Sequence, residues 1–161
     1  MVKSQRERVL SKATGDVLKA VFALETSTQV ALPSDIAVRT GTSHAFVTKM
    51  LKNMSTMGLV RYAPYQGVRL TNEGTKSAVE LARHHRLLER FLTDTLGFSP
   101  SGAHVEAERL EHVISEEFEA RLADFLHHPT TCPHGAPIPN PDGTLPALQH
   151  ATGPQEAKIE P

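Results

Sequence analysis

Two stretches of the sequence carry histidine and glutamate side chains at helical spacing. His85 and Glu89 are four residues apart in a stretch whose apolar pattern predicts a helix over 75–96, so they share one face. A second predicted helix, over about 103–118, has a polar sector about 100° wide. That sector holds His104, Glu108, Glu111 and His112.

Neighbouring carboxylates and imidazoles in a partly buried site repel one another or change protonation, and a divalent cation removes that conflict. All of these donors are nitrogen or oxygen atoms, without a thiolate, which favours Mn(II) or Fe(II) over structural zinc. The rest of the second helix is expected to form a buried arc, made of Ala107, Leu110, Val113, Ile114 and Phe118.

Other interpretations of these residues stay open. Charged strips on helices are often solvated surface, and this applies to the cluster at 108–112. A carboxylate-bridged di-metal oxidase would use the same residue types, but it takes ligands from four facing helices with paired Glu-x-x-His motifs. Here two long predicted helices carry candidate ligands, and neither contains that motif. We assign no metal role to the other candidates, namely His84, His127, His128, His150 and the Cys132-Pro133-His134 segment.

The first half of the chain has the order of a winged helix-turn-helix. Apolar spacing predicts a helix over roughly 5–27, and a short helix opens at Pro33-Ser34 with Ser34 as its N-cap. A glycine-containing turn at 40–43 leads to a third helix from His44 to about Met57, with Phe46 on its inner face. Two short β-prone runs, 59–62 and 67–70, flank turn residues and predict a hairpin, or wing.

The charge distribution supports a polyanion partner for this half. Residues 1–70 hold ten basic and four acidic side chains, whereas residues 71–161 hold seven basic and fourteen acidic ones. In a helix-turn-helix the recognition helix meets base edges and flanking cations meet phosphates. The candidate DNA-binding residues are Ser43, His44, Ala45, Thr48, Lys49, Lys52, Arg61 and Arg69.

Three segments are expected. Residues 1–74 form the DNA-binding domain, 75–128 a helical metal-binding and dimerisation domain, and 129–161 a proline-rich linker or tail. The last segment holds eight of the eleven prolines and little apolar periodicity, so we expect it not to bury a core. No apolar run is long enough to span a membrane, and the charged N-terminus is unlike a secretory signal. A single cysteine, which forms no internal disulfide, fits a reducing cytoplasm.

Several strings of the sequence resemble the diphtheria-toxin-repressor/manganese-transport-regulator family. They are the wing at 65–71, Arg83 to Leu92, Glu106 to Ser115, and Pro133 to Pro139, and the resemblance covers about residues 10–140. It implies a mainly α protein that dimerises through its second half and binds a palindromic operator when loaded with Fe(II) or Mn(II). In this family the metal is a co-repressor that silences metal-uptake genes.

The resemblance also implies which residues bind the metal. The regulatory site would be Asp16, Glu108, Glu111 and His112, and the ancillary site His85, Glu89 and His104. Iron-type members have Met and Cys where this chain has Asp16 and Glu108, which favours the manganese type. Members with a paired-metal site have an acid where Lys19 stands. Many members continue into an SH3-like domain that completes the ancillary site, and that domain is absent from these 161 residues.

We therefore expect a cytoplasmic, metal-dependent transcriptional regulator and not an enzyme. Its expected partners are double-stranded operator DNA and a second copy of itself, without a membrane or a small organic substrate. A winged-helix regulator that ignores metals and senses an organic ligand is the remaining alternative, and it would leave the Glu and His clusters without a role.

Overall fold

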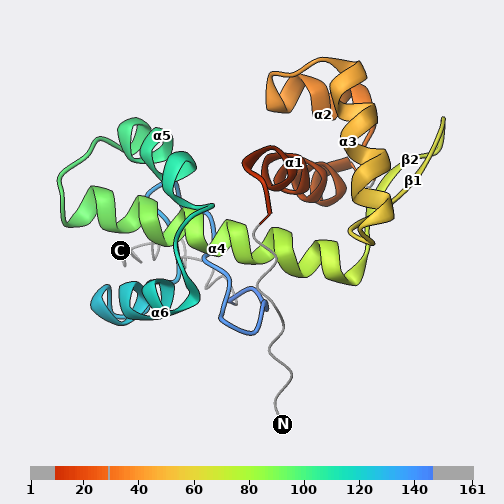
Figure 1. Cartoon of the computed structure of the whole chain (residues 1–161). Helices are drawn as coiled ribbons and strands as arrows, with labels where there is room; N and C mark the ends of the chain where they lie inside the picture. The colour runs from red at the N-terminus through yellow and green to blue at the C-terminus, as the bar shows by residue number, and fades with distance from the viewer. Residues whose placement is uncertain (1–9, 29, 147–161) are drawn as a thin grey trace, which may run out of the picture.

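The structure of the chain is a computed structural model that describes residues 10–28 and 30–146. α4 runs through the molecule, with the first three helices and the hairpin at one end and α5 and α6 on either side of the other (Figure 1). The elements are α1 (Lys12–Thr28), α2 (Pro33–Thr40), α3 (His44–Thr56), β1 (Val60–Ala63), β2 (Gly67–Leu70), α4 (Asn72–Asp94), α5 (Pro100–Leu110) and α6 (Glu116–Phe125).

α2 and α3 form the predicted helix-turn-helix. Pro33 begins α2, where its missing N–H is not needed, so Ser34 lies inside the helix and its predicted role as N-cap is wrong. Gly41 ends α2 with a φ of 66°, in the left-handed region that glycine adopts without strain. Ser43 then caps α3, because its side chain accepts a hydrogen bond from the backbone N–H of Phe46 at 3.2 Å.

The predicted wing is present as an antiparallel hairpin of β1 and β2. Val60 pairs with Leu70, and Arg61 pairs with Arg69. Backbone and side-chain contacts fix the hairpin to the helices: the N–H of Val68 donates to the carbonyl of Ala31 at 2.8 Å. The wing is therefore a fixed extension of the helix-turn-helix.

Two hydrophobic cores lie along α4. The first fills the space between α1, α2, α3 and the hairpin, and its largest fully buried side chains include Leu18, Ile36, Leu51 and Met54. The second lies between α4, α5 and α6 and includes Leu87, Leu88, Leu92 and Leu122. Because α4 contributes Ala78 to the first core and Leu87 to the second, one helix connects the two halves. Phe46 of α3 is 40% exposed, which corrects its predicted place on the inner face.

The helix predicted over 103–118 is two helices. α5 ends at Leu110, the chain turns through 111–115, and α6 begins at Glu116 with Ser115 as its N-cap. The turn takes Val113 and Phe118 out of the predicted buried arc: they are 75% and 47% exposed. Ser115 caps α6, and acidic residues follow in the first turn of that helix. Both features favour the start of a second helix over the continuation of α5.

The part of the proline-rich segment that the structure describes, residues 129–146, is more ordered than predicted, and residues 147–161 lie outside the described residues. Residues 129–146 pack against α4, and Cys132 and Ile138 are buried there, Ile138 within the second core. Arg86 of α4 donates to the carbonyl of Pro137 at 2.5 Å, which fixes the segment to the helix. Prolines lower the entropy that a chain loses on folding, so few apolar contacts suffice here.

At the N-terminus, α1 begins at Lys12, later than predicted, and residues 5–9 lie outside the described residues. Among the residues that the structure describes, no helix is long and apolar enough to cross a membrane.

Candidate metal centres and nucleic-acid face

The first candidate centre joins α1 to the turn after α5. Asp16 lies on α1, and Glu111 and His112 lie at the start of that turn. The Nε2 atom of His112 is 3.2 Å from Asp16 Oδ1 and 3.1 Å from Glu111 Oε1. One donor atom from each of these three residues lies within 4.8 Å of the donor atoms of the other two, so one metal ion could contact all three. Three of the four predicted regulatory residues are therefore brought together.

Glu108 is the member that the structure does not bring into this group. Its side chain is 48% exposed and faces back along α5 to His104, with 3.4 Å between Glu108 Oε1 and His104 Nε2. Glu111 is the C-cap of α5 and keeps helical backbone angles, so Glu108 and Glu111 remain three residues apart on the same helical path, and Glu108 stays outside the group because its side chain turns toward His104.

The charges in the first centre stabilise one another. Hydrogen bonds to Asp16 and Glu111 raise the pKa of His112 to about 9. Burial alone would raise the pKa of Glu111, but hydrogen bonds from His112, His85 and Lys19 hold it well below its ordinary value. Burial also opposes ionisation of Asp16, whose pKa is lowered overall by His112 and Lys12. Both carboxylates are therefore charged at neutral pH.

The second candidate centre contains all three predicted ancillary residues. His85 Nε2 lies 3.0 Å from Glu89 Oε1, and His104 Nδ1 lies 2.9 Å from the same oxygen. Glu89 is 2% exposed. Burial favours its neutral form, but the hydrogen bonds from the two imidazoles prevail and lower its pKa to about 2. An ionised carboxylate between two imidazoles is a donor set that fits a divalent cation.

Two residues that we had not assigned to a metal lie beside Glu89. The Nδ1 atom of His134 is 3.3 Å from Glu89 Oε1, and Cys132 completes a second group of three possible ligands with Glu89 and His134. The Cys-x-His spacing is present in the sequence, but the proline content of the segment predicts a tail there. A thiol within reach of this centre also changes the donor chemistry, because the predicted ligands are nitrogen and oxygen atoms.

Glu111 connects the two centres. Its Oε1 atom faces His112, while its Oε2 atom accepts a hydrogen bond from His85 Nδ1 at 2.5 Å. His85 therefore has one nitrogen on Glu111 and the other toward Glu89. This arrangement matches that of metal-binding histidines, whose outer ring nitrogen is held by a carboxylate.

These residues fit a bound divalent cation. The donors of the first centre are carboxylate oxygens and imidazole nitrogen, which hard and borderline cations prefer. The nitrogen of His112 that faces both carboxylates is Nε2, whereas its Nδ1 atom lies against Gly15 of α1 without a hydrogen-bond partner among the described residues.

The predicted DNA-binding residues lie on α3 and on the hairpin. His44, Ala45, Lys49, Lys52, Arg61 and Arg69 are exposed. The two hydroxyl side chains are partly engaged: Ser43 caps α3, and Thr48 donates to the carbonyl of His44 at 2.9 Å. Arg61 and Arg69 stand opposite each other on the wing, where like charges repel and a phosphate would relieve the repulsion.

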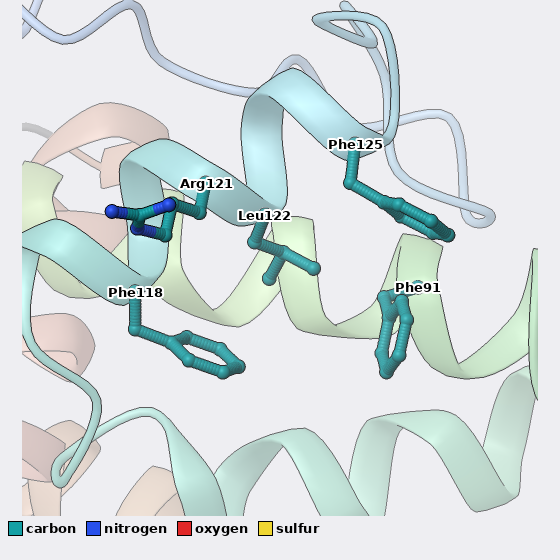
Figure 2. A pocket seen from close by; sticks show the side chains of 5 residues that line it. All are labelled: Phe91, Phe118, Arg121, Leu122 and Phe125. Atoms are coloured by element: carbon teal, nitrogen blue, oxygen red, sulfur yellow. The ribbon is translucent and has the colours of Figure 1, made fainter.

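An apolar groove lies on α4 and α6. It is formed by Phe91, Phe118, Arg121, Leu122 and Phe125 and has a volume of about 280 Å³ (Figure 2). Phe118 and Phe125 are 47% and 59% exposed, although large aromatic side chains are normally covered.

A winged helix-turn-helix joined by one long helix to a helical unit with two histidine–carboxylate centres defines a class of metal-linked DNA-binding proteins. Comparison with known proteins agrees. Residues 9–68 match the family model for the N-terminal DNA-binding domain of iron-dependent repressors, and residues 71–140 match the model for their metal-binding and dimerisation domain. The chain belongs to the iron-dependent repressor family.

Individual relatives support the same assignment. The iron-dependent repressor IdeR of Mycobacterium tuberculosis is 39% identical over 122 residues, which are 76% of this chain and 53% of that protein. A manganese-dependent transcriptional repressor in complex with manganese aligns with a TM-score of 0.79 and 34% identity, over 84% of this chain and 63% of that one. The structure of ScaR with bound Cd2+ aligns with a TM-score of 0.71 and 36% identity, over 91% of this chain and 68% of that one.

The chain spans about half the length of the curated relatives it matches. These relatives are transcriptional repressors, that is, DNA-binding regulators, and they do not favour the alternative of a di-metal oxidase.

Proposed function

We propose that this protein is a metal-dependent transcriptional repressor that binds operator DNA as a homodimer and represses genes of metal uptake. Mn(II) or Fe(II) would serve as its co-repressor. Because it acts on chromosomal DNA, its place would be the cytoplasm. The proposal rests on family membership and on one observation of this chain, namely that Asp16 of the DNA-binding half faces Glu111 and His112 of the other half.

That observation suggests how metal and DNA binding are linked. Asp16, Glu111 and His112 would hold the regulatory ion, with Glu108 as an expected fourth ligand after a change of its side-chain rotamer. An ion held by residues of both halves would favour one position of α1 relative to α4. The metal-free protein would sample more positions of its DNA-binding half, so operator binding would have to select one of them. Coupling of this kind is commonly worth about 5–150-fold in affinity.

The second centre would hold an ancillary ion. His85, Glu89 and His104 are the residues predicted for this role, and His134 lies near the same Glu89 oxygen, with Cys132 close by. We infer that the regulatory centre selects Mn(II) or Fe(II) through its oxygen donors. Zn(II) generally binds a given set of donors more tightly than Mn(II) or Fe(II) does. The preference for Mn(II) or Fe(II) would therefore come from the coordination geometry that these oxygen donors allow, and not from a higher affinity. The same ions would suit the second centre less well if the Cys132 thiol takes part.

The homodimer would place two copies of α3 in successive major grooves of an inverted repeat. We assign the groove of Figure 2 to the dimer interface, because it lies on α4 and α6 within the residues matched by the family's metal-binding and dimerisation model. Lys49, Lys52, Arg61 and Arg69 would contact phosphates, which makes the affinity fall steeply with salt.

The decisive experiment is a metal titration of DNA affinity. Selection from a random duplex library with Mn(II) present should yield an inverted repeat. Fluorescence anisotropy on that duplex should then show tight binding with Mn(II) and loss of binding with a chelator. The Glu111→Ala variant should lose the Mn(II) response while its circular dichroism spectrum stays unchanged.

Glu106→Ala is the matched control. Glu106 lies on α5 near the same region, but its carboxylate pairs only with the exposed Arg109, at 3.2 Å. This variant should respond to Mn(II) as the wild type does. Operator affinity of the wild type that a chelator leaves unchanged would refute the proposed function.

A further inference from the structure

Lys19 of α1 is the residue of the first centre to which neither the fold nor the proposed function gives a role. Its Nζ atom lies 2.6 Å from Glu111 Oε1, across 92 positions of the sequence. The side chain of Lys19 is 24% exposed, and that of Glu111 is completely buried. This contact is therefore one of the few charge pairs that connect the two halves of the molecule.

The ammonium group sits on the very oxygen that faces the metal ligands. Glu111 Oε1 is the atom 3.1 Å from His112 Nε2, and the other oxygen of Glu111 is used by His85. A divalent cation among Asp16, Glu111 and His112 would need the same Oε1 atom. Two positive groups within a few ångströms of each other in a half-buried site repel strongly.

A second lysine of α1 shows a different geometry. Lys12 Nζ contacts Asp16 Oδ2 at 2.7 Å, whereas His112 faces the other oxygen, Oδ1. The side chain of Lys12 is also 59% exposed, so water screens its charge. Lys12 thus provides a natural comparison: it has the same charge on the same helix but leaves the metal-facing oxygen free.

We propose that Lys19 is an internal cation that competes with the metal ion for Glu111 and thereby sets the metal concentration at which the regulatory centre fills. In the metal-free protein its ammonium group neutralises the buried Glu111 carboxylate. Metal binding displaces the ammonium group into solvent, which its partial exposure permits. The inference rests on the proposed metal binding at this centre.

The test is the affinity of the centre for Mn(II) alone, measured from free Mn(II) by electron paramagnetic resonance. Lys19→Met keeps the aliphatic stem and removes the charge. We expect it to lower the dissociation constant of the Asp16-dependent site by about fivefold or more, as for two ligands coupled through one residue. Lys12→Met should change that constant by less than about twofold, because exposed ion pairs contribute little.

Two further measurements test whether the change in Mn(II) affinity arises at this centre. In an Asp16→Asn background the gain from Lys19→Met should disappear, since the two changes act on one site. Without metal, Lys19→Met should also lower the melting temperature, because the buried Glu111 carboxylate loses a partner, and Mn(II) should then raise that temperature more than in the wild type. Lys19→Gln repeats the test with a polar side chain in case Met perturbs the fold.

The outcomes separate this inference from the proposed function. If the wild type shows no Asp16-dependent Mn(II) binding, both are overturned. If the wild type binds Mn(II) and Lys19→Met and Lys19→Gln bind it equally or more weakly, Lys19 is a purely structural partner of Glu111 and only the inference fails.

Discussion

At the scale of single residues, the two centres consist of charges that are stable only in each other's presence. Glu111 is 1% exposed and Glu89 is 2% exposed, and a lone carboxylate at such depth would be strongly disfavoured. In the metal-free protein, the negative charges of these carboxylates are balanced by neighbouring imidazoles and by the ammonium group of Lys19. The same contacts must be exchanged when a cation binds, because a metal-bound imidazole nitrogen cannot carry a proton.

The first prediction at this scale is the pH dependence of the metal-free fold. The pKa of His112 is raised from 6.5 to about 9. The contribution of His112 to the free energy of unfolding is therefore complete below pH 6.5 and is lost as the pH rises through 9. The pKa of Glu89 is lowered from 4.5 to about 2, so its contribution is complete above pH 4.5 and is lost as the pH falls toward 2. Stability with chelator present should therefore be highest between pH 4.5 and 6.5.

Urea midpoints measured with chelator from pH 3 to 10 check this expectation. Replacing His112 by Asn should flatten the alkaline side of the profile. It should also weaken the acidic side, because Asp16 and Glu111 lose the partner that lowers their pKa values, whereas the part due to Glu89 should remain. A wild-type midpoint that stays constant between pH 6.5 and 9 would show that His112 is not held as a cation.

At the scale of elements, the position of α1 depends on a glycine inside it. A Cβ atom on Gly15 would lie 2.5 Å from His112 Cε1 and 2.8 Å from His112 Nδ1. Real Cβ atoms do not approach other atoms so closely. Gly15 therefore lets α1 pack against the imidazole, at a cost in helix propensity of about 0.5–1 kcal/mol.

We predict that Gly15→Ala lowers stability although alanine is the better helix former. Overpacking of a tight contact costs about 1–3 kcal/mol, which exceeds the gain in propensity. The displaced His112 should also bind Mn(II) more weakly. Chemical denaturation and Mn(II) titration measure both effects.

Gly102→Ala in α5 is the comparison, because a Cβ atom there meets Ser99 Oγ at 3.1 Å and no closer neighbour. That variant should retain wild-type stability and Mn(II) affinity. If Gly15→Ala is as stable as Gly102→Ala and binds Mn(II) equally well, α1 does not owe its position to Gly15.

At the scale of the whole molecule, α4 carries the DNA-binding half at one end and the proposed dimer interface at the other (Figure 1). A dimer built on α4 and α6 would fix the distance between two copies of α3. The metal centre between α1 and the turn at 111–115 lies between these two regions. Metal binding at this centre would then change the distance between the two copies of α3 without altering the dimer interface.

The prediction at this scale concerns the groove of Phe91, Phe118 and Phe125. A buried charge at the centre of an apolar interface costs at least about 2 kcal/mol, or roughly thirtyfold in dimer dissociation constant. Phe118→Glu should therefore shift the protein toward monomer in sedimentation velocity experiments. Phe98→Glu, at a phenylalanine that is 41% exposed and does not line the groove, should leave the dimer intact. Equal behaviour of the two variants would place the interface elsewhere.

The local elements of this fold follow from short-range signals in the sequence. Gly41 and Ser43 mark the turn and the helix start, and four-residue spacing puts His85 and Glu89 on one face, because such signals act within one or two helical turns. The winged helix-turn-helix could be predicted for this reason. Ser115 followed by acidic residues was an equally local signal for a new helix, but the continuing apolar pattern concealed it.

The ligand sets of the two centres depend on contacts between distant parts of the chain. Asp16 meets His112 across 96 positions, and Lys19 meets Glu111 across 92, so both contacts depend on how α1 packs on α4. Cys132 and His134 reach Glu89 because Arg83 and Arg86 of α4 bind carbonyls of the proline-rich segment. No periodicity encodes such long-range contacts, because they follow from which apolar surfaces bury each other. Glu111 is buried where it contacts Lys19 of α1 and His85 of α4, whereas Glu108 stays at the surface.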